Sequence, residues 1–419
     1  MRCERHGCPS LIPNVARPRH RDVAHRDGEG RLDCVAATPH YGNEREGDPV
    51  MRIALMGTRG IPAKYGGFET FYENLGPGLA ARGHDVTVYI RPHAVGKFDG
   101  REYRGVHLVG VTSIRTKHLE TITHTLGSVL HGLTRRYDVV YVCGVGNTPL
   151  AWIPHLRRAR VVLNVDSSDW KRKKWGRLAA VYLHATERFA ARVADVIVAD
   201  SQVIQARYRA DYAADARFFP YGANVVDAAG TATLERYGLR SRGYILWVGR
   251  LEPEARVEEL IRAFVSLGPT DHKLVIVGDS PYAGNYRQTL DALTTPDVVF
   301  TGYQFGDAYR ELGFHAFAYV QTSPTSGTSP ALLDQMAAGG AVIVRGTPTN
   351  LEVIGDTGLA YDPANGVADL AAVLRRLIAD PGLADRLRAA ARQRAATVYS
   401  WDRIIDDYEQ LFAELLGRA

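Results

Sequence analysis

The stretch MRIALMGTRGIPAKYGGFE, residues Met51 to Glu69, decides the fold. It runs from a short apolar segment, Arg52–Met56, through a glycine-rich turn into the helical pattern of Glu69–Arg82. Many α/β domains begin with a strand, a glycine-rich turn and a helix in this order. The sequence therefore predicts an α/β domain whose first strand is Arg52–Met56.

The same alternation continues along the chain, and its apolar strands fall into two series. The first is Arg52–Met56, Asp85–Ile90, Val139–Cys143, Val161–Val165 and Val196–Ala199, and the second is Tyr244–Val248, Lys273–Val277, Val298–Phe300, Ala316–Val320 and Ala341–Val344. Segments of helical spacing separate the strands, including Leu178–Ala194, Val257–Leu267 and Ser329–Ala338. This pattern predicts two doubly wound, Rossmann-like lobes facing a cleft, with ligands bound at turns that follow strands.

The chain is expected to divide into four parts. Residues 1–50 have neither helical nor strand periodicity and balance their charges, so we expect a disordered extension that precedes a natural start at Met51. Residues 51–225 form the first lobe and 226–400 the second, separated near the polar stretch Asn224–Arg242. Residues 401–419 form a final helix whose apolar stripe is predicted to pack back on the first lobe.

Composition excludes several classes of protein. The 419 residues are 46% hydrophobic and 23% charged with a formal charge of +5, which argues against a disordered chain and gives no reason to expect nucleic-acid binding. No apolar run is long enough to span a membrane and no secretory signal is visible, so a cytoplasmic protein is expected. Cys3, Cys8, Cys34 and Cys143 fit neither a disulfide framework nor a zinc-binding spacing.

The turn after the first strand is the first candidate site. Gly66, Gly67 and Glu69 lie where a glycine-rich loop enters a helix, and such a loop allows a ligand to approach the backbone closely. It matches neither a dinucleotide fingerprint nor a Walker A loop. An acceptor or phosphate loop is one interpretation, and a simple strand-to-helix connection is the other.

A second candidate follows the strand Val161–Val165. Asp166 is placed to orient a sugar hydroxyl or to stabilise developing positive charge, although a helix cap would use the same residue type. The basic run Lys171–Lys174 is either a solvated face or, together with Arg157, Arg158 and Arg160, a surface for anionic lipid headgroups or for a diphosphate-linked acceptor.

The second lobe supplies two further turns. Arg250 follows the strand Tyr244–Val248 and is suited to binding phosphate, with a surface salt bridge as the alternative. The candidate donor-binding segment before and within the next helix consists of Ser326, Gly327, Thr328, Ser329 and Asp334. Asp334, two turns inside that helix, is placed to accept hydrogen bonds from ribose hydroxyls or to face solvent.

Seven motifs, in this order and spacing, resemble the GT-B glycosyltransferases of family 4 and their rhamnosyltransferase-like branch. They are RGIPAKYGGFE (Arg59–Glu69), NVDSSDWKRKKW (Asn164–Trp175), ADVIVADS (Ala194–Ser201), PYGAN (Pro220–Asn224), VGRLEPE (Val248–Glu254), FTGYQFGDAYREL (Phe300–Leu312) and SGTSPALLDQMAAG (Ser326–Gly339). The resemblance extends from Met51 to Leu416.

The resemblance implies a nucleotide-diphosphate sugar held mainly by the second lobe. Arg250 would bind the diphosphate, Gly327 and Thr328 would cradle it, and Asp334 would contact the ribose as the second acid of an E-x7-E motif. Asp166 stands where many members carry a catalytic-site histidine, and Arg250 would stabilise the leaving diphosphate. The acceptor, a glycan or a polyprenyl-diphosphate-linked sugar, would meet Gly66, Gly67 and Glu69.

Two departures from the motif matter. Ser326 replaces the first acid of E-x7-E, and Ala255 replaces the lysine that usually follows the arginine, so Arg256 becomes a candidate replacement cation.

The resemblance implies a retaining, metal-independent hexosyltransferase without cofactor, acting in cell-surface polysaccharide assembly, with rhamnose as one candidate sugar. It would work at the cytoplasmic face of the plasma membrane. The alternatives are a non-catalytic relative that binds nucleotide sugar and, disfavoured by the fingerprint, a Rossmann oxidoreductase.

Overall fold

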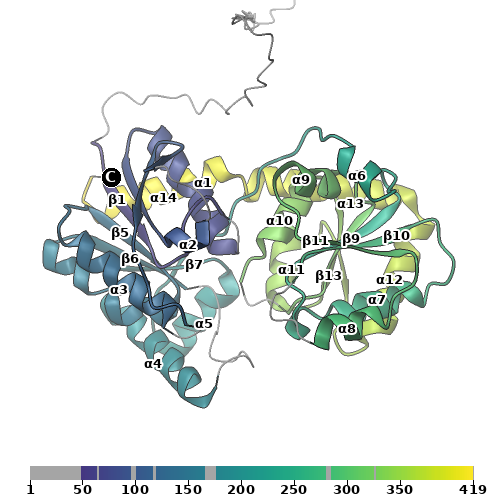
Figure 1. Ribbon diagram of the computed structural model, residues 1–419, viewed down its shortest axis with the longest axis horizontal. Helices are drawn as coiled ribbons and strands as arrows, with labels where there is room; N and C mark the ends of the chain where they lie inside the picture. Colours follow the sequence, from purple (N-terminus) through teal and green to yellow (C-terminus); the bar gives the residue numbers. More distant parts are fainter. Residues whose placement is uncertain are drawn as a thin grey trace, which may run out of the picture. The chain divides into compact units, whose positions relative to one another are not determined.

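The computed structural model describes residues 49–63, 66–95, 101–116, 119–165, 176–279, 285–324 and 327–418. Within these residues the first lobe contains an eight-stranded sheet in the order β3-β4-β2-β1-β5-β6-β7-β8 (Figure 1). Only the short β3 pairs antiparallel, with β4, and the other neighbours are parallel. The strands are β1 (Arg52–Met56), β2 (Asp85–Ile90), β3 (Glu102–Tyr103), β4 (Val106–Gly110), β5 (Val139–Cys143), β6 (Arg160–Val165), β7 (Val196–Ala199) and β8 (Arg217–Phe218).

Helices cover both faces of this sheet, so its strands are buried on both sides, as their apolar sequences require. On one face α1 (Gly67–Ala81) and α14 (Trp401–Leu415) pack on side chains such as Ile53 and Leu55. The opposite face carries α3 (Glu120–Gly132), the short helices η1 (Val145–Leu150) and η2 (Ile153–Arg157), α4 (Arg177–Val193) and α5 (Gln202–Tyr212). The short α2 (Pro92–Val95) follows β2.

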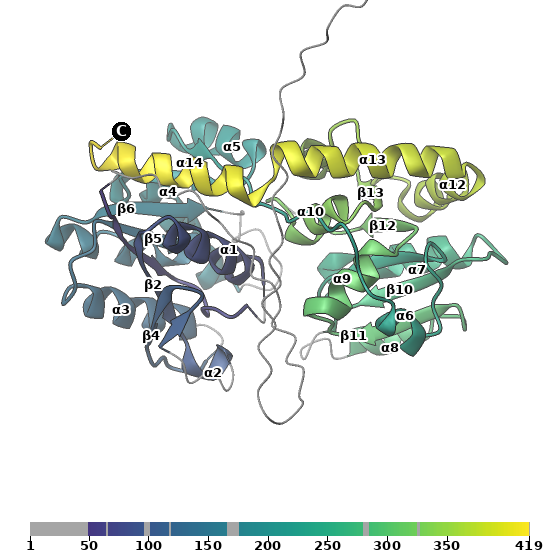
Figure 2. The ribbon, with the colours of Figure 1, turned by 90° about the horizontal axis from the view of Figure 1, so that it is seen from above.

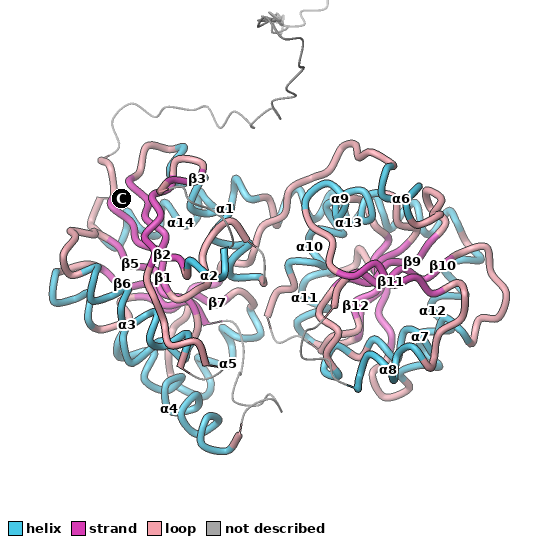
Figure 3. Tube along the Cα trace, viewed as in Figure 1, coloured by secondary structure: helices cyan, strands magenta, loops and turns pink. Residues whose placement is uncertain are grey.

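The second lobe has a six-stranded sheet, all parallel, in the order β11-β10-β9-β12-β13-β14 (Figure 3). This count refers to the described residues. The strands are β9 (Tyr244–Val248), β10 (Lys273–Val277), β11 (Val298–Gly302), β12 (Ala318–Gln321), β13 (Ala341–Arg345) and β14 (Leu359–Tyr361). The order places β9 and β12 side by side, so the turns that follow them leave the same edge of the sheet.

The helices of the second lobe also form two layers. One layer packs with Trp247 and Ile276 and consists of α7 (Val257–Val265), α8 (Asn285–Asp291) and α12 (Gly366–Ala379). The other includes α9 (Gly306–Phe314), α10 (Pro330–Ala337), α11 (Pro348–Ile354) and α13 (Pro381–Val398). The short α6 (Ala232–Arg236) and η4 (Pro253–Ala255) complete the lobe.

The last helix, α14, returns to the first lobe, where it lies along α1 (Figure 2). Its Tyr408 hydroxyl is 3.0 Å from the Tyr141 hydroxyl, and its Glu409 accepts from Arg82 at 2.6 Å. A Cβ at Gly78 would lie 2.3 Å from the Ile405 side chain, so glycine permits the close approach of the two helices. The predicted return of the C-terminal helix is therefore confirmed.

The predicted fold class, two doubly wound Rossmann-like sheets, is also confirmed. One strand is displaced: the segment predicted over Ala316–Val320 forms β12 at Ala318–Gln321, because the Ala316 amide still bonds the Gly313 carbonyl at the end of α9. The proposed extension lies outside the described residues, apart from Pro49 and Val50.

Across the described part of the chain, none of the helices combines the length and the apolar character needed to cross a bilayer.

Candidate active site

The turn after β1 is shaped by two glycines and one carboxylate. Gly57 and Gly60 have φ angles of +98° and +101°, and a Cβ at Gly57 would lie 2.7 Å from the Cys143 carbonyl oxygen. The Glu69 carboxylate accepts a 3.0 Å hydrogen bond from the Arg59 amide. Glu69 thus ties the turn to the first turn of α1, which is a structural role in addition to the predicted acceptor role.

Glu69 is a buried acid with cations nearby. Glu69 is only 7% exposed, and this burial raises the pKa of its carboxyl group. The Arg59 amide and the positive charges of Arg59 and Arg91 lower that pKa in opposition. The carboxylate is therefore held at the start of α1 by hydrogen bonding and charge together.

Gly66 and Gly67 bring the first lobe against the second. Gly66 is the N-cap of α1 and Gly67 its first residue. A Cβ at Gly67 would lie 3.1 Å from Cγ of Pro330, the first residue of α10. The N-terminal ends of α1 and α10 therefore meet, and both ends carry partial positive charge.

The segment before α10 is also fixed to the first lobe. The Thr328 hydroxyl donates to the backbone carbonyl of Asp200, which directly follows β7. Ser329 is the N-cap of α10, and its hydroxyl accepts from the Leu332 amide at 3.4 Å. Two of the predicted donor-binding residues are thus positioned by named hydrogen bonds.

A further junction between the lobes lies beside this one. Glu352 of α11 accepts hydrogen bonds from the Ser201 hydroxyl at 2.9 Å and from the Gln202 amide at 2.8 Å. Ser201 is the N-cap of α5 in the first lobe. Sequence reasoning did not identify this junction, since no local pattern relates residues 151 positions apart.

Arg250 lies in the turn after β9, as predicted. Its side chain is 39% exposed, and its guanidinium is 3.4 Å from the Glu252 carboxylate. The turn is packed tightly against the next one, because a Cβ at Gly278 would lie 1.8 Å from the Gly249 carbonyl oxygen. A rigid turn thus presents an accessible guanidinium at the edge from which the loop leading to α10 also leaves.

Asp334 lies one turn inside α10 rather than the predicted two, since the helix begins at Pro330. It is half-buried, and Oδ2 accepts a 3.1 Å hydrogen bond from the Tyr309 hydroxyl of α9. Burial raises the pKa of Asp334 to about 7, and the hydrogen bond from Tyr309 opposes that increase. The carboxyl group therefore faces a partner and titrates near neutral pH.

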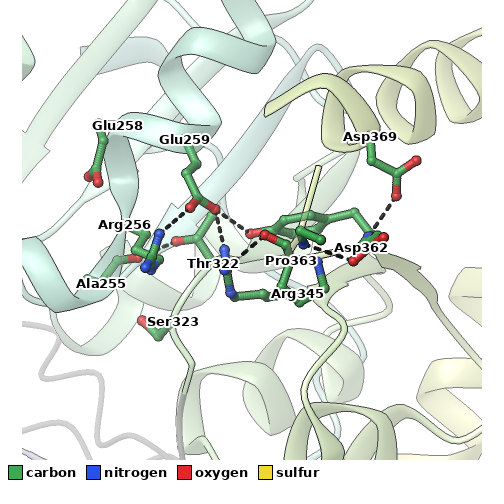
Figure 4. Close-up of polar contacts among 12 residues, drawn as sticks. Ala255, Arg256, Glu258, Glu259, Thr322, Ser323, Arg345, Asp362, Pro363 and Asp369 are labelled. Carbon is green, nitrogen blue, oxygen red and sulfur yellow. Dashed lines mark hydrogen bonds and ion pairs between the residues drawn. The ribbon is translucent and has the colours of Figure 1, made fainter. Parts of the chain in front are cut away.

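Arg256 belongs to a network of charges that also includes Glu259 and Arg345 (Figure 4). Its guanidinium donates to Glu259 Oε1 at 2.6 Å, while Arg345 and Tyr361 donate to Glu259 Oε2 at 2.5 and 3.2 Å. Ala255, at the position of the expected lysine, is 9% exposed, and its carbonyl accepts from the Thr322 hydroxyl. The candidate replacement cation is thus already paired with a carboxylate.

Several predicted residues lie outside the described part of the chain: Asp166, Ser326 and the basic run Lys171–Lys174. Among the described ones, the structure brings Gly67 next to the start of α10, Thr328 next to Asp200, and Glu69 next to Arg59. Arg250 and Asp334 remain candidates at the same edge of the second sheet, each with its own local partner.

The fold and the meeting of strand-end turns from two Rossmann-like lobes define a GT-B architecture. The family "Glycosyl transferase 4-like domain" matches residues 66–222, and "Glycosyl transferases group 1" matches residues 236–394. These matches follow the two lobes and together cover most of the chain. Each lobe of the chain thus carries one of these glycosyltransferase domains, and the two lobes have the GT-B fold.

One curated relative and two solved structures illustrate this similarity. A GDP-mannose-dependent alpha-(1-6)-phosphatidylinositol monomannoside mannosyltransferase of Mycolicibacterium smegmatis is 26% identical over 374 residues, covering 83% of this chain and 94% of the relative. Sucrose-phosphate synthase of Thermosynechococcus elongatus has a TM-score of 0.74 at 21% identity, covering 88% of this chain and 100% of that one. HepE of Anabaena, solved with UDP and glucose, has a TM-score of 0.72 at 16% identity, covering 87% and 100%. At these identities, the two solved structures are evidence for the fold and not for a particular activity.

Proposed function

We propose that this glycosyltransferase moves a hexose, with rhamnose as one candidate, from a nucleotide-diphosphate donor on the second lobe to an acceptor on the first. The observation that carries the proposal is the contact between the starts of α1 and α10, where Gly67 meets Pro330. Two helix N-termini and the accessible Arg250 supply positive charge to a diphosphate. The UDP and the glucose named in the HepE structure are consistent with a nucleotide-diphosphate sugar as the donor.

In the proposed reaction the bond between sugar C1 and the diphosphate oxygen breaks as the acceptor hydroxyl oxygen bonds to C1. The hydroxyl proton leaves with the diphosphate. Arg250 and the helix starts stabilise the charge that grows on the leaving group, so the proposal includes no metal and no cofactor. Attack from the face of the departing diphosphate retains the anomeric configuration. Asp166, outside the described residues, is proposed to orient the acceptor.

The acceptor is proposed to be lipid-linked or a glycan, in cell-surface polysaccharide assembly at the cytoplasmic face of the plasma membrane. The lipid acceptor in the name of the Mycolicibacterium relative supports the lipid-linked choice. Gly66, Gly67 and Glu69, at the carboxyl edge of the first sheet, are the residues proposed to meet it.

The test is turnover of a panel of UDP-, GDP- and dTDP-hexoses with a polyprenyl-diphosphate-linked acceptor. We expect release of one nucleoside diphosphate per glycosidic bond, retained configuration by NMR, and equal rates with and without EDTA. An inverted product or loss of activity with EDTA would contradict the corresponding step of the mechanism.

The pairing of Arg256 with Glu259 favours a second candidate, a non-catalytic nucleotide-sugar-binding component of a complex, because it leaves the replacement cation engaged. The same panel separates the two functions. A pure binder would show saturable affinity for a nucleotide sugar and no nucleoside diphosphate release.

A further inference from the structure

The outer side of α4 carries two strips of different character. Tyr182, Ala185 and Phe189 are three and four positions apart and form an exposed apolar strip, with Tyr182 40% and Phe189 52% exposed. Arg188 and Arg192, four positions apart, lie on the neighbouring strip, which also includes the exposed Arg177 and His184. A surface helix that covers a single lobe needs only one apolar strip, and here that is the buried one containing Leu183 and Ala190.

Hydrogen bonds show which way each strip faces. The Tyr182 hydroxyl donates to the Gly146 carbonyl at 2.9 Å, so the apolar strip lies on the side of η1. Glu187, the only acid of α4, is buried and accepts from Arg207 of α5 at 2.6 Å, so the cationic strip lies on the side of α5. The outer surface of the helix therefore exposes arginines and no carboxylate.

Residues 152–158, beside the apolar strip, also expose both apolar and cationic side chains. Trp152 and Leu156, in and next to η2, are 50% and 63% exposed. Arg157 and Arg158 follow them and are exposed. Asp195, which contacts this segment, is paired with His155 at 2.8 Å and Arg160 at 3.0 Å. We call the exposed side chains of α4 and 152–158 the α4–η2 face.

A small pocket opens between η2 and the end of α3. Its apolar lining includes Leu133, Tyr137 and Pro154, and two exposed arginines, Arg135 and Arg157, border it. The hollow is small, and its two arginines extend the positive charge of the α4–η2 face.

We propose that the α4–η2 face docks on a bilayer surface rich in anionic phospholipid. Exposed Trp, Phe and Leu side chains enter the headgroup boundary while arginines pair with lipid phosphates, which is how interfacial helices bind. Charge complementarity favours this occupant over a second copy of the chain, since a face of arginines repels itself.

The position of α4 gives the docking a consequence, which rests on the proposed function. The helix begins with Arg177 after β6, so its N-terminal end lies toward the carboxyl edge of the first sheet. Gly66 and Gly67 follow β1 at that same edge. Docking through the face therefore places the proposed acceptor loop beside the membrane that would hold a lipid-linked acceptor.

The test is co-sedimentation of the full chain with vesicles of phosphatidylcholine alone or with one quarter phosphatidylglycerol. We expect binding to the anionic vesicles only, weakened by 0.5 M salt. Arg188→Ala/Arg192→Ala should bind on the order of 25-fold more weakly, since each arginine near the surface contributes about fivefold. Trp152→Ala/Phe189→Ala should also lose binding, while the matched pair Arg262→Ala/Arg376→Ala, exposed on α7 and α12, should bind like wild type.

The proposal is overturned if the wild-type protein does not bind anionic vesicles or binds neutral ones equally well. It is also overturned if both face variants bind anionic vesicles as well as the control variant does. It is also overturned if Trp152→Ala/Phe189→Ala changes the oligomeric state and not vesicle binding, because the face would then be a contact between copies. Circular dichroism checks that each variant is folded. Nucleotide-sugar affinity, measured without vesicles, tests the proposed function separately, so the failure of one does not imply failure of the other.

Discussion

The carboxylate of Glu352 accepts a 2.9 Å hydrogen bond from the Ser201 hydroxyl, and the two residues belong to different lobes. The same carboxylate accepts from the amides of Gln202 at 2.8 Å and Val203 at 3.2 Å. These amides belong to the first turn of α5, where no helix carbonyl is available to accept from them, although the Val203 amide also donates to the hydroxyl of the N-cap Ser201. One lobe thus caps a helix of the other, next to the hydrogen bond from Thr328 to Asp200.

Replacing Glu352 by alanine should destabilise the junction between the lobes. The substitution removes an acceptor that three donors share, and only the Val203 amide keeps another acceptor, the Ser201 hydroxyl. Loss of a helix cap costs about 1–2 kcal/mol. Guanidinium titration should show a lower midpoint for Glu352→Ala. The control is Asp356→Ala, an exposed acid just beyond α11. Equal midpoints for the two variants would mean that the cap contributes no stability.

Arg250→Ala should lower turnover with little change in stability. The guanidinium is 39% exposed in a rigid turn, so its removal leaves no buried gap. If it stabilises charge on the leaving diphosphate, kcat/KM should fall about 100- to 1,000-fold. Arg250→Lys should recover part of that loss, since lysine keeps the charge but not the planar fork.

The matched control for Arg250 is Arg262→Ala, which removes an exposed arginine from α7 of the same lobe. It should keep wild-type kcat/KM and affinity for the nucleotide sugar. If Arg250→Ala retains full turnover, Arg250 has no part in stabilising the leaving group.

The positions of the turns were predictable because they follow from local periodicity. An apolar run such as Arg52–Met56 ends where glycines begin, and parallel strands direct their following turns to one edge. Arg250 and Thr328 could therefore be assigned to such turns from the sequence. Weakly patterned elements such as β8, two residues long, carry no signal that separates them from a loop.

The partners of the site residues were not predictable, because they depend on contacts between distant segments. Glu259 and Arg345 are 86 positions apart and meet only because α7 lies near the end of β13. Arg345 did give one signal, a charge at the end of the apolar strand AVIVR, which a buried strand tolerates only with a partner. The pKa of Asp334 likewise depends on burial that a sequence does not show.

Glu259→Gln should destabilise the second lobe strongly. The carboxylate accepts from Arg345, whose side chain is 9% exposed, and from Arg256, whose side chain is 44% exposed. Removing the negative charge leaves the buried Arg345 without compensation, which costs about 3–5 kcal/mol. Urea unfolding, followed by tryptophan fluorescence to which the buried Trp247 of this lobe contributes, should show this loss.

Arg256→Ala is the matched control for the Glu259 network. It removes the exposed cation and leaves the pair between Glu259 and Arg345 intact, so we expect a cost below about 1 kcal/mol. Similar losses in Arg256→Ala and Glu259→Gln would show that burial of Arg345 does not decide the stability of the network.

Affinity for the nucleotide sugar should fall as the pH is lowered from 8 to 6. Burial raises the pKa of Asp334 to about 7, and only the deprotonated carboxylate accepts two ribose hydrogen bonds at full strength. Its charged fraction drops about tenfold across this interval. Calorimetry with an intact nucleotide sugar, which does not titrate there, should show a comparable loss in wild type and a flat profile in Asp334→Asn.

The same pKa determines a stability profile of opposite sense. The unfolded chain releases this proton near pH 4 and the native state near pH 7, so the native state binds more protons between these values. Stability from this group is present below about pH 4 and is lost as the pH rises toward 7. Asp334→Asn should therefore gain stability relative to wild type as the pH increases.

Tyr309→Phe removes the hydrogen bond that opposes the increase in the pKa of Asp334, so the pH profile of nucleotide-sugar affinity should move to higher pH. A profile unchanged by both substitutions would assign the titration to another group.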